Sequence, residues 1–302
     1  MAIGEDHDVF LVPSEFRTIT EAIEAAVRPA TIMISPGVYV EDLRVAGKPY
    51  LVLQSARFLR RGVTVVGVAA PSVLAIDGSQ VHLSGIDIRS NARARGMSIV
   101  ESHVSLQDCV VSGNHVGESF DQPFGAGIMG RSSTVRIQRS TVAGNTVQRN
   151  GPAGGGGLHF VDCNVEVMGS SVQTNAVYAA GMARGGGIWC ERSKMRMWRS
   201  RVTDNVMYAE DCEGAGIYFR DSGGAVIAGS VITGNGSPEG RGGGVFVRGN
   251  PGGVVIHRNS FVGRNHPTDL DIDERDPLAQ AVSESQPRED GLSGDRGHRA
   301  PS

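Results

Sequence analysis

The sequence predicts an all-β solenoid, a right-handed parallel β-helix, from a fixed repeat, short alternating segments and rows of equivalent residues. Asparagines recur at steps of 23, 31, 30, 30, 30 and 30 residues. A constant period in this range is typical of repeat architectures. The repeated asparagines are Asn91, Asn114, Asn145, Asn175, Asn205, Asn235 and Asn265. We therefore expect one elongated domain that grows coil by coil.

Each repeat holds three short segments in which apolar and polar residues alternate. In the copy that ends at Asn175 these segments are Leu158–Val161, Val165–Met168 and Ser171–Thr174. Each is long enough for a strand, and none leaves room for a helix before the next. Three strands per coil, with neighbouring coils paired about 4.8 Å apart along the axis, describe a parallel β-helix.

Residues at fixed distances before each asparagine are alike from coil to coil. Three positions earlier stand Ile88, Val111, Val142, Val172, Val202, Ile232 and Val262. Five positions earlier stand Cys109, Ser140, Ser170, Ser200, Ser230 and Ser260. The β-branched row predicts a stack inside the coil, and the hydroxyl row predicts a turn whose backbone groups are satisfied by side chains. Glycine pairs such as Gly155–Gly156 predict a tight turn with positive φ.

The ends of the solenoid are expected to differ from its coils. Residues 1–29 are predicted to be a lead-in and a short helix, because Thr18 and Glu21 form a capping-box pattern before an apolar run. The helix would cover strand edges that are otherwise open at the N-terminal end. The β-helix is expected over residues 30–265. Residues 266–302 are polar, and we expect a C-terminal cap followed by a disordered tail.

The N-terminal segments resemble a known family. TITEAIEAA (residues 18–26), TIMISPGVYVEDLRV (31–45) and LVLQS (51–55) are similar to the opening of pectin methylesterases, in the pectin lyase-like right-handed β-helix superfamily. The later repeats resemble those of bacterial surface β-helix proteins. The resemblance covers roughly residues 16–265 and implies the fold, with a substrate groove on a strand face beside the long loops. The catalytic segments of methylesterases, polygalacturonases and epimerases are absent, so no catalytic residue carries over.

Composition narrows the classes of partner and location. The net charge of −3 gives no basic footprint for nucleic acid, and no apolar run is long enough for a membrane span. The N-terminus lacks the apolar region of a secretory signal. The four cysteines, without metal-binding spacing, are expected to be free thiols in a reducing, cytoplasmic setting, and no metal or cofactor is expected. They are Cys109, Cys163, Cys190 and Cys212. The oligomeric state is left open.

Alternation in the first strand of each coil sends one residue per coil outward. This row is Met129, His159, Trp189, Tyr218 and Phe246. We predict that it forms an exposed aromatic stripe beside the long loops, where the rings could stack against a sugar. The alternative is that the loops bury the stripe, or that its rings stack on one another as a stabilising ladder.

A second outward row supplies the candidate catalytic groups. Glu191 neighbours Arg220 there, and His159 lies nearby. We assign His159 as acid/base, Glu191 as its partner or a second acid/base, and Arg220 as anion binder. The predicted substrate-binding residues are Trp189, Tyr218, Phe246, Met129, Arg248, Arg184 and Asp121. The alternative is a surface salt bridge between neighbouring coils.

Two hypotheses of function follow. The first is a lyase, hydrolase or isomerase/epimerase that acts on a carbohydrate or similar polyhydroxylated substrate. The second is a non-catalytic binding or scaffold β-helix, or an intracellular biosynthetic enzyme with a non-carbohydrate substrate. Fold alone does not decide between them. The discriminating observation is whether His159, Trp189, Tyr218 and Glu191 line an open cleft.

Overall fold

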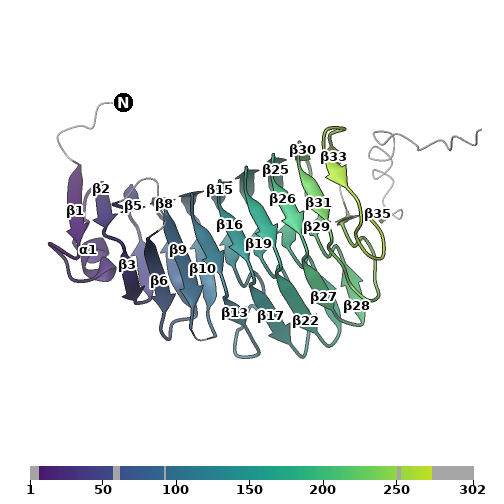
Figure 1. Ribbon diagram of the computed structural model, residues 1–302, viewed down its shortest axis with the longest axis horizontal. Coiled ribbons are helices and arrows are strands. Elements are labelled where there is room, and N and C mark those ends of the chain that lie inside the picture. The colour runs from purple at the N-terminus through teal and green to yellow at the C-terminus, as the bar shows by residue number, and fades with distance from the viewer. Residues whose placement is uncertain (1–6, 57–61, 92, 250–252, 274–302) are drawn as a thin grey trace, which may run out of the picture.

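The chain forms a solenoid of parallel strands, with one short helix at its N-terminal end (Figure 1). A computed structural model describes residues 7–56, 62–91, 93–249 and 253–273. Three long parallel sheets run the length of the solenoid, and each coil contributes one strand to each sheet. The predicted fold class is confirmed.

The first of the three sheets, here the long sheet, has ten strands. Its order is β1 (Asp8–Val12), β2 (Ala30–Ile34), β5 (Leu51–Ser55), β8 (Gln80–Ser84), β11 (His103–Gln107), β15 (Thr134–Gln138), β20 (Asn164–Met168), β25 (Lys194–Trp198), β30 (Ala225–Ala228) and β33 (Val254–Ile256). The second, here the covered sheet, has nine strands. Its order is β4 (Leu43–Ala46), β7 (Ser72–Asp77), β10 (Arg95–Val100), β14 (Ile128–Arg131), β19 (Leu158–Val161), β24 (Ile188–Glu191), β29 (Ile217–Arg220), β32 (Val245–Arg248) and β35 (Leu270–Ile272).

The third sheet also has nine strands, and it carries the β-branched row. Its order is β3 (Gly37–Val40), β6 (Val63–Gly67), β9 (Ile86–Ser90), β12 (Val110–Ser112), β16 (Thr141–Ala143), β21 (Ser171–Gln173), β26 (Arg201–Thr203), β31 (Val231–Thr233) and β34 (Phe261–Val262). The predicted inward row is confirmed from Ile88 to Ile232, whose side chains are at most 1% exposed.

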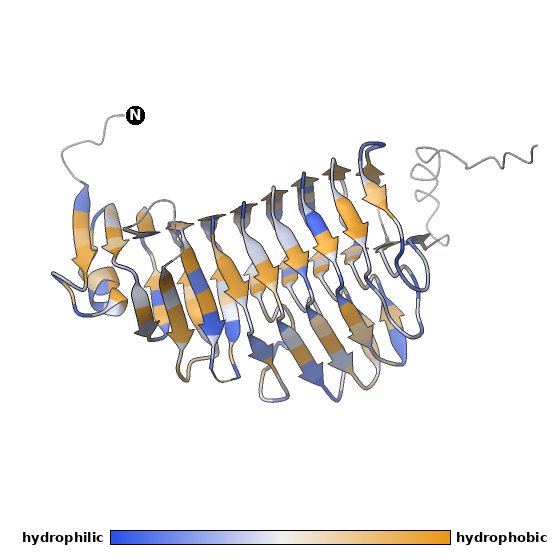
Figure 2. Ribbon diagram, viewed as in Figure 1, coloured by the Kyte–Doolittle hydropathy of each residue, from blue (hydrophilic) through white to orange (hydrophobic). Residues whose placement is uncertain are grey.

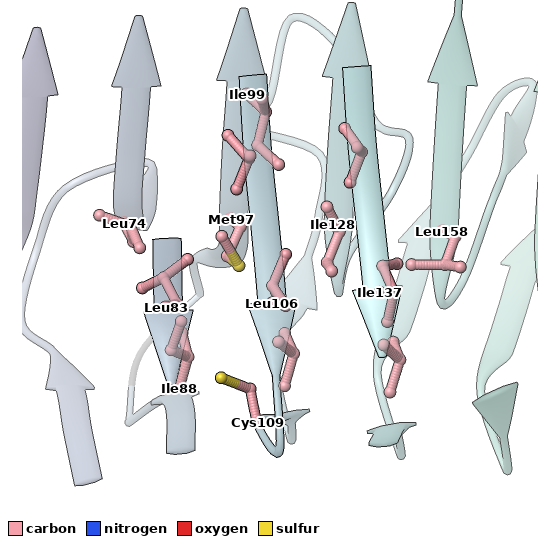
Figure 3. Packing of buried hydrophobic residues seen from close by; sticks show 14 of the residues in the cluster. Leu74, Leu83, Ile88, Met97, Ile99, Leu106, Cys109, Ile128, Ile137 and Leu158 are labelled. Atoms are coloured by element: carbon pink, nitrogen blue, oxygen red, sulfur yellow. The ribbon is translucent and has the colours of Figure 1, made fainter. Parts of the chain in front are cut away.

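The core is a column of apolar side chains that the three sheets enclose. Figure 3 shows Leu74, Met97 and Ile128 of the covered sheet facing Leu83 and Leu106 of the long sheet. Hydrophobic residues run along the strands, and many turns are hydrophilic (Figure 2). Because residues at one position stack in register from coil to coil, each inward side chain meets its counterpart above and below.

The asparagine row forms a continuous hydrogen-bonded ladder inside the solenoid. The backbone N–H and the Nδ2 of Asn145 both donate to Oδ1 of Asn175, at 3.0 and 2.9 Å, and Nδ2 also donates to the Val111 carbonyl. The pattern repeats from Asn114 to Asn265. It ends on a carboxylate, because Asn265 donates to Asp269. Each amide therefore pairs backbone groups that the turn would otherwise bury unpaired.

The hydroxyl row is confirmed as a second ladder. Ser140 Oγ accepts the Cys109 N–H at 3.1 Å and donates to the Gln138 carbonyl at 2.7 Å. A third row at the preceding turn was not predicted. It consists of Ser79, Ser102, Ser133, Cys163, Ser193 and Ser222. Two of the three turns in each coil are thus satisfied by small side chains.

The N-terminal end is closed as the capping pattern predicts. Helix α1 (Ile19–Ala25) follows Thr18, whose hydroxyl accepts the Glu21 N–H at 3.1 Å. The Glu41 carboxylate accepts the N–H groups of Ile19 and Thr20 in the first turn, where the helix dipole also favours negative charge. The helix buries Ile19 and two further apolar residues against β1, β2 and β4.

The sheets extend beyond residues 30–265 at both ends. Strand β1 lies within the predicted lead-in and pairs with β2. Part of its outer edge is blocked, because the Leu11 N–H donates to Glu15 Oε2 at 3.0 Å and the Leu11 carbonyl accepts the Glu15 N–H. Strand β35 pairs with β32 beyond Asn265. Most of the predicted tail, residues 274–302, lies outside the described residues.

We predict that Asn175→Ala lowers the free energy of unfolding by about 3 kcal/mol or more. The substitution leaves the Asn145 N–H buried without a partner, at about 1–3 kcal/mol, and also removes a bond each from Asn145 Nδ2, Asn205 Oδ1 and the Val142 carbonyl. The matched control is Asn259→Ala, which removes an exposed acceptor of the Gly229 N–H. Urea denaturation followed by circular dichroism measures both. Equal midpoints for the two variants would contradict a structural role for the ladder.

Candidate functional site

The long loops predicted at one edge of the solenoid form two additional parallel sheets. One contains β13 (His115–Val116), β17 (Thr146–Arg149), β22 (Ala176–Ala179) and β27 (Val206–Tyr208). The other contains β18 (Ala153–Gly154), β23 (Met182–Arg184) and β28 (Asp211–Glu213). Figure 1 shows the first sheet along the lower edge of the solenoid. Together the two sheets form what we call the side lobe.

The side lobe has its own apolar core. Val116, Val147, Val177 and Met207 are fully buried there, against alanines such as Ala153. These four residues are spaced by 31, 30 and 30 positions, the same steps as the asparagines that precede them. The lobe is therefore a second stack of coils, built in register with the first, and it lies against the outward face of the covered sheet.

The predicted aromatic stripe is buried beneath this lobe, so the expectation of an exposed stripe is wrong. Exposed fractions are 6% for Met129, 4% for His159, 9% for Trp189, 2% for Tyr218 and 0% for Phe246. The rings contact one another along the axis, with centroids 4.7 Å apart for His159–Trp189 and 5.7 Å for Trp189–Tyr218 and Tyr218–Phe246. The alternative prediction, a self-stacking row covered by the loops, describes the structure.

A glycine explains how the lobe closes over the stripe. A Cβ added at Gly154, in β18, would lie 2.4 Å from the Trp189 ring and 2.2 Å from the Arg184 carbonyl oxygen. Any side chain there would hold the lobe away from the covered sheet. The next residue, Gly155, has φ of +59°, which confirms the predicted positive-φ turn.

His159 is sealed from solvent, which constrains its predicted acid/base role. Neither ring nitrogen has a hydrogen-bond partner among the described residues. Burial lowers the pKa of His159 to about 3, and the nearby charges of Arg95 and Arg131 act in the same direction. The imidazole is therefore neutral near pH 7, and it could reach a substrate only if the lobe opened.

Glu191 and Arg220 are neighbours as predicted, within an ion-pair ladder. Arg220 Nη1 lies 3.9 Å from Glu191 Oε2, and Glu191 also contacts Arg192. Arg192 in turn pairs with Asp162 at 2.9 Å. The Glu191 carboxylate is thus shared between two guanidinium groups, as the salt-bridge alternative proposed.

Two predicted arginines hold the lobe in place. The Arg184 side chain is 3% exposed and pairs with Glu213 at 2.8 Å and with Asp211 at 2.7 Å. Arg248 pairs with the same Glu213 and, at 3.4 Å, with Asp273. Burial raises the pKa of Glu213, and the two arginines oppose that shift. This network joins β23 and β28 of the lobe to β32 of the covered sheet.

The open surface lies on the outer side of the lobe. A hollow of about 530 Å³ there, which we call the tyrosine groove, crosses several coils. It is lined by Arg93, His115, Gly117, Glu118, Gln148, Arg149, Asn150, Tyr178, Ala179, Ala180 and Tyr208. Among the predicted site residues, only Asp121 lies near it, exposed on the adjoining loop.

Two stacked tyrosines form one wall of the groove. Tyr178 and Tyr208 are 41% and 47% exposed, with ring centroids 5.2 Å apart and planes within 3°. Most other lining residues come from earlier coils, so the groove extends from the Tyr178 ring toward the N-terminal end. Tyr208 therefore lies on the far side of Tyr178, and the near side of the Tyr178 ring faces the hollow and the coil that contains Gln148.

The remaining walls are polar and include two arginines and one glutamate. Within the described part of the chain, Arg93 and Arg149 take part in no ion pair, and Glu118 accepts the Asn150 N–H. Gly117 has no side chain and leaves space beside His115 and Arg93. Burial, followed by the charge of Arg93, lowers the pKa of His115. An aromatic face beside guanidinium, imidazole and amide donors suits a hydroxyl-rich ligand that carries an acceptor or negative group.

The sequence analysis missed the tyrosines, although a signal was present. Tyr178 and Tyr208 are 30 residues apart and therefore occupy one repeat position. They lie in the segments between an asparagine and the next glycine pair, where long loops are predicted. The available indication of further strands was the alternation within VQR (147–149) and VYA (177–179), which begin two positions after Asn145 and Asn175.

The chain matches a family of known fold. Residues 54–261 match the model described as "Right handed beta helix region". The chain belongs to this family. No curated protein matches the sequence at a significant level.

Solved structures of similar fold include carbohydrate-active enzymes. The alignment with pectin methylesterase from Aspergillus niger covers 95% of this chain and 98% of that enzyme, with 11% identity and a TM-score of 0.45. Pectin methylesterase from Erwinia chrysanthemi is 12% identical, covers 73% and 82%, and scores 0.38. The A-module of an Azotobacter vinelandii mannuronan C-5 epimerase is 14% identical, covers 84% of each chain and scores 0.23. These three comparisons show a similarity of fold alone.

The prediction that the four cysteines are free thiols is confirmed. All four are free and buried. Burial raises the pKa of Cys109 and of Cys163 to about 11, so these thiols stay protonated near pH 7. In the described ranges, no cluster of three metal-ligating side chains occurs, and no helix is long and apolar enough to cross a membrane.

We predict that Trp189→Ala destabilises the fold by about 3–5 kcal/mol, because it leaves a cavity between the lobe and the covered sheet. The exposed control Tyr208→Ala is expected to cost about 1 kcal/mol or less. Thermal and urea unfolding measure both variants. A soluble Trp189→Ala protein with unchanged stability would show that the row is accessible after all.

We predict that His159 makes stability fall as pH decreases below 6.5. The unfolded imidazole binds a proton near pH 6.5, whereas the folded one does so only near pH 3. Between these values the unfolded state binds more protons, so the free energy of unfolding decreases by about 1.4 kcal/mol per pH unit. His159→Leu should remove this part of the slope. Parallel pH dependences for wild type and variant between pH 6 and 4 would contradict a buried, neutral His159.

Proposed function

We propose that this β-helix is a binding protein for a carbohydrate or similar polyhydroxylated ligand, and that the tyrosine groove is its site. The observation that carries the proposal is the exposed ring of Tyr178, which is stacked on Tyr208 and lines an open hollow of about 530 Å³. Sugar rings present C–H groups that pack against aromatic faces, while their hydroxyls require polar partners. The groove provides both.

The polar partners lie where a stacked ring would need them. Gln148 is the Cα partner of Tyr178 in the preceding coil, and its side chain is exposed. Asn150 and Arg149 follow on the same turn, and their side chains also line the groove. A ring placed on Tyr178 would therefore meet amide and guanidinium donors along one edge.

The binding hypothesis gains support over the catalytic stripe because the stripe is closed. His159, Trp189 and Tyr218 are each at least 91% buried, so they offer a ligand no surface. The hypothesis of a lyase, hydrolase or isomerase therefore needs other residues. An open groove on the opposite side of the lobe provides a binding surface without them.

One observation favours a catalytic variant of the same site. A Cβ placed at Gly117 would lie 3.6 Å from His115 Nε2 and 3.9 Å from Arg93 Nη1. An imidazole nitrogen and a guanidinium thus converge above a floor that carries no side chain. With Glu118 beside them, these groups could move a proton and hold an anion. Turnover should then depend on His115 and Glu118, not on His159 and Glu191.

We predict that Tyr178→Ala reduces affinity for the bound sugar about tenfold or more, because the stacking face is lost. Tyr208→Ala should have a smaller effect, since it removes only the support behind Tyr178. Isothermal titration with neutral and acidic mono- and disaccharides identifies the ligand in wild type first. The same sugar is then titrated into both variants.

The matched control is Phe261→Ala, an exposed aromatic residue at the far end of the third sheet. Its affinity should equal that of wild type. Equal affinity for wild type and Tyr178→Ala would place the site elsewhere, and the absence of binding for every sugar would reject a carbohydrate ligand. Product analysis of each bound sugar by mass spectrometry separates binding from turnover.

A further inference from the structure

One segment of the solenoid carries four cations and no acidic residue. It reads KMRMWRSR, residues 194–201, and it supplies β25, the turn after it and the first residue of β26. Alternation in β25 buries Met195 and Met197 in the core and sends the intervening side chains outward. All four cations are exposed, along the edge where the long sheet turns into the third sheet. They are Lys194, Arg196, Arg199 and Arg201.

These cations lack the acidic partners that other arginines of the solenoid have. Among the described residues none of the four takes part in an ion pair, whereas Arg192 pairs with Asp162 in the neighbouring coil. The strands on either side, β20, β21, β30 and β31, contain one acidic residue, Glu166. Glu166 is the Cα partner of Arg196, but its carboxylate bonds Arg136 on its other side at 2.7 Å. The positive charge of this segment is therefore locally unbalanced.

The surface beside the cations becomes apolar toward the C-terminal end. The outward positions of Arg196 and Arg201 continue in register through the next two coils, along β30 and β33 and along β31 and β34 (Figure 1). Every residue at these positions is apolar: Val226 and Val255 on the long sheet, and Val231 and Phe261 on the third sheet. Val255 and Phe261 are 48% and 49% exposed. Because these side chains point away from the core, packing of the core does not account for them.

Trp198 lies where the cationic and apolar parts meet. It is the last residue of β25, it is half-buried, and its Cα partners are Met168 and Ala228 in the coils on either side. Met168 is itself 37% exposed. Tryptophan is favoured where an apolar layer meets water, because the indole combines a large apolar body with one polar N–H. We call the four cations, Trp198 and the four apolar residues the cationic edge.

We propose that the cationic edge binds the surface of an anionic lipid bilayer. The four cations contact the negative headgroups, and Trp198, Val255 and Phe261 enter the boundary between the headgroups and the acyl chains. Apolar area buried at this boundary and attraction to anionic lipids together determine the strength of such binding. The inference is independent of the proposed function, because the tyrosine groove lies on the side lobe and uses none of these residues.

Two other occupants fit the cationic edge less well. A second copy of the chain, paired through this edge about a twofold axis, would bring the cations of both copies together without acidic partners. A nucleic acid would satisfy the cations, but the aliphatic side chains of Val226 and Val255 give a base no ring on which to stack. A bilayer satisfies both parts of the edge, since its charged headgroups cover an apolar layer.

The test is co-sedimentation of the full chain with vesicles at low and high salt. The vesicles contain phosphatidylcholine alone, or phosphatidylcholine with about one third phosphatidylserine. The charge-reversed variant is Arg196→Glu/Arg201→Glu. Its matched control is Arg44→Glu/Arg89→Glu, which reverses two exposed arginines of β4 and β9, gives the same net charge and leaves the cationic edge intact.

The apolar part of the edge has its own pair of variants. Val255→Ala/Phe261→Ala truncates the two most exposed apolar residues of the edge. Its control, Val38→Ala/Val40→Ala, truncates two exposed valines of β3 near the N-terminal end. Unfolding in urea, measured for all four variants, shows which of them are folded before vesicles are added.

Wild type should bind the anionic vesicles about tenfold or more tightly than the neutral ones, and high salt should weaken this binding. Arg196→Glu/Arg201→Glu should lower the partition constant about tenfold or more, while its control should retain most of the wild-type value. Val255→Ala/Phe261→Ala should lower it about threefold or more and leave the salt dependence in place. The valine control should match wild type.

Tryptophan fluorescence measures how deeply the edge is seated. The chain has two tryptophans, and Trp189 is buried, so a change on vesicle binding reports Trp198. Lipids with brominated acyl chains should quench the emission of the bound protein. Trp198→Phe should bind the vesicles but lose this quenching. Binding that leaves the wild-type emission unquenched would contradict the placement of Trp198 at the acyl boundary.

Other results would overturn the proposal as a whole. These are equal binding to neutral and anionic vesicles, binding to neither, or equal loss in the two charge-reversed proteins. A fluorescent single-stranded oligonucleotide and sedimentation equilibrium without lipid test the other occupants. An oligonucleotide that Arg196→Glu/Arg201→Glu releases, with no vesicle binding, would assign the edge to nucleic acid. A dimer that Val255→Ala/Phe261→Ala dissociates, with no vesicle binding, would assign it to a second copy.

Discussion

The rest of the structure depends on the register that the asparagine ladder imposes. Each amide is buried and bonded to the coils on both sides, so each coil must return to the same height before the next begins. The segments that follow the asparagines therefore begin at the same height in each coil. Because they are also similar in length, each can pair with the equivalent segment of the neighbouring coil. This is why the segments after Asn114, Asn145, Asn175 and Asn205 pair as strands of the side lobe and do not form independent loops.

Once the lobe exists, it decides which outward residues are accessible. The lobe encloses its own apolar core, and the aromatic row of the covered sheet forms a separate cluster beneath Gly154 and Arg184. Gly154 lets the two layers approach, and Glu213 ties them through Arg184 and Arg248. Because breaking a buried ion pair leaves a charge without a partner, this clamp favours a closed lobe. Large aromatic side chains here are buried in the fold, and the tyrosine groove lies on the outer side of the lobe.

Sequence reasoning was sufficient for the fold and insufficient for the site, for one physical reason. Period and alternation state which residues point into a coil, so the rows at Val172, Ser170 and Asn175 were predictable, as was the cap at Thr18. Alternation also predicts that Trp189 points out of its coil, and this prediction is correct. Alternation does not indicate whether another layer covers that face, because burial depends on contacts between segments far apart in the chain.

A binding site on a solenoid requires a break in the repeat. Identical coils would give level ladders of identical side chains, with no hollow. The asparagine and serine rows are nearly uniform, whereas the outer row of the lobe changes from Gly117 to Gln148 and then to Tyr178 and Tyr208. The change from no side chain to a large ring creates the depression and its aromatic wall. The first lobe segment also departs from the later ones, because Arg95 holds it as a loop where β18 and β23 stand in the following coils. The tyrosine groove lies where the repeat is broken, and this coincidence is the physical basis for placing recognition there.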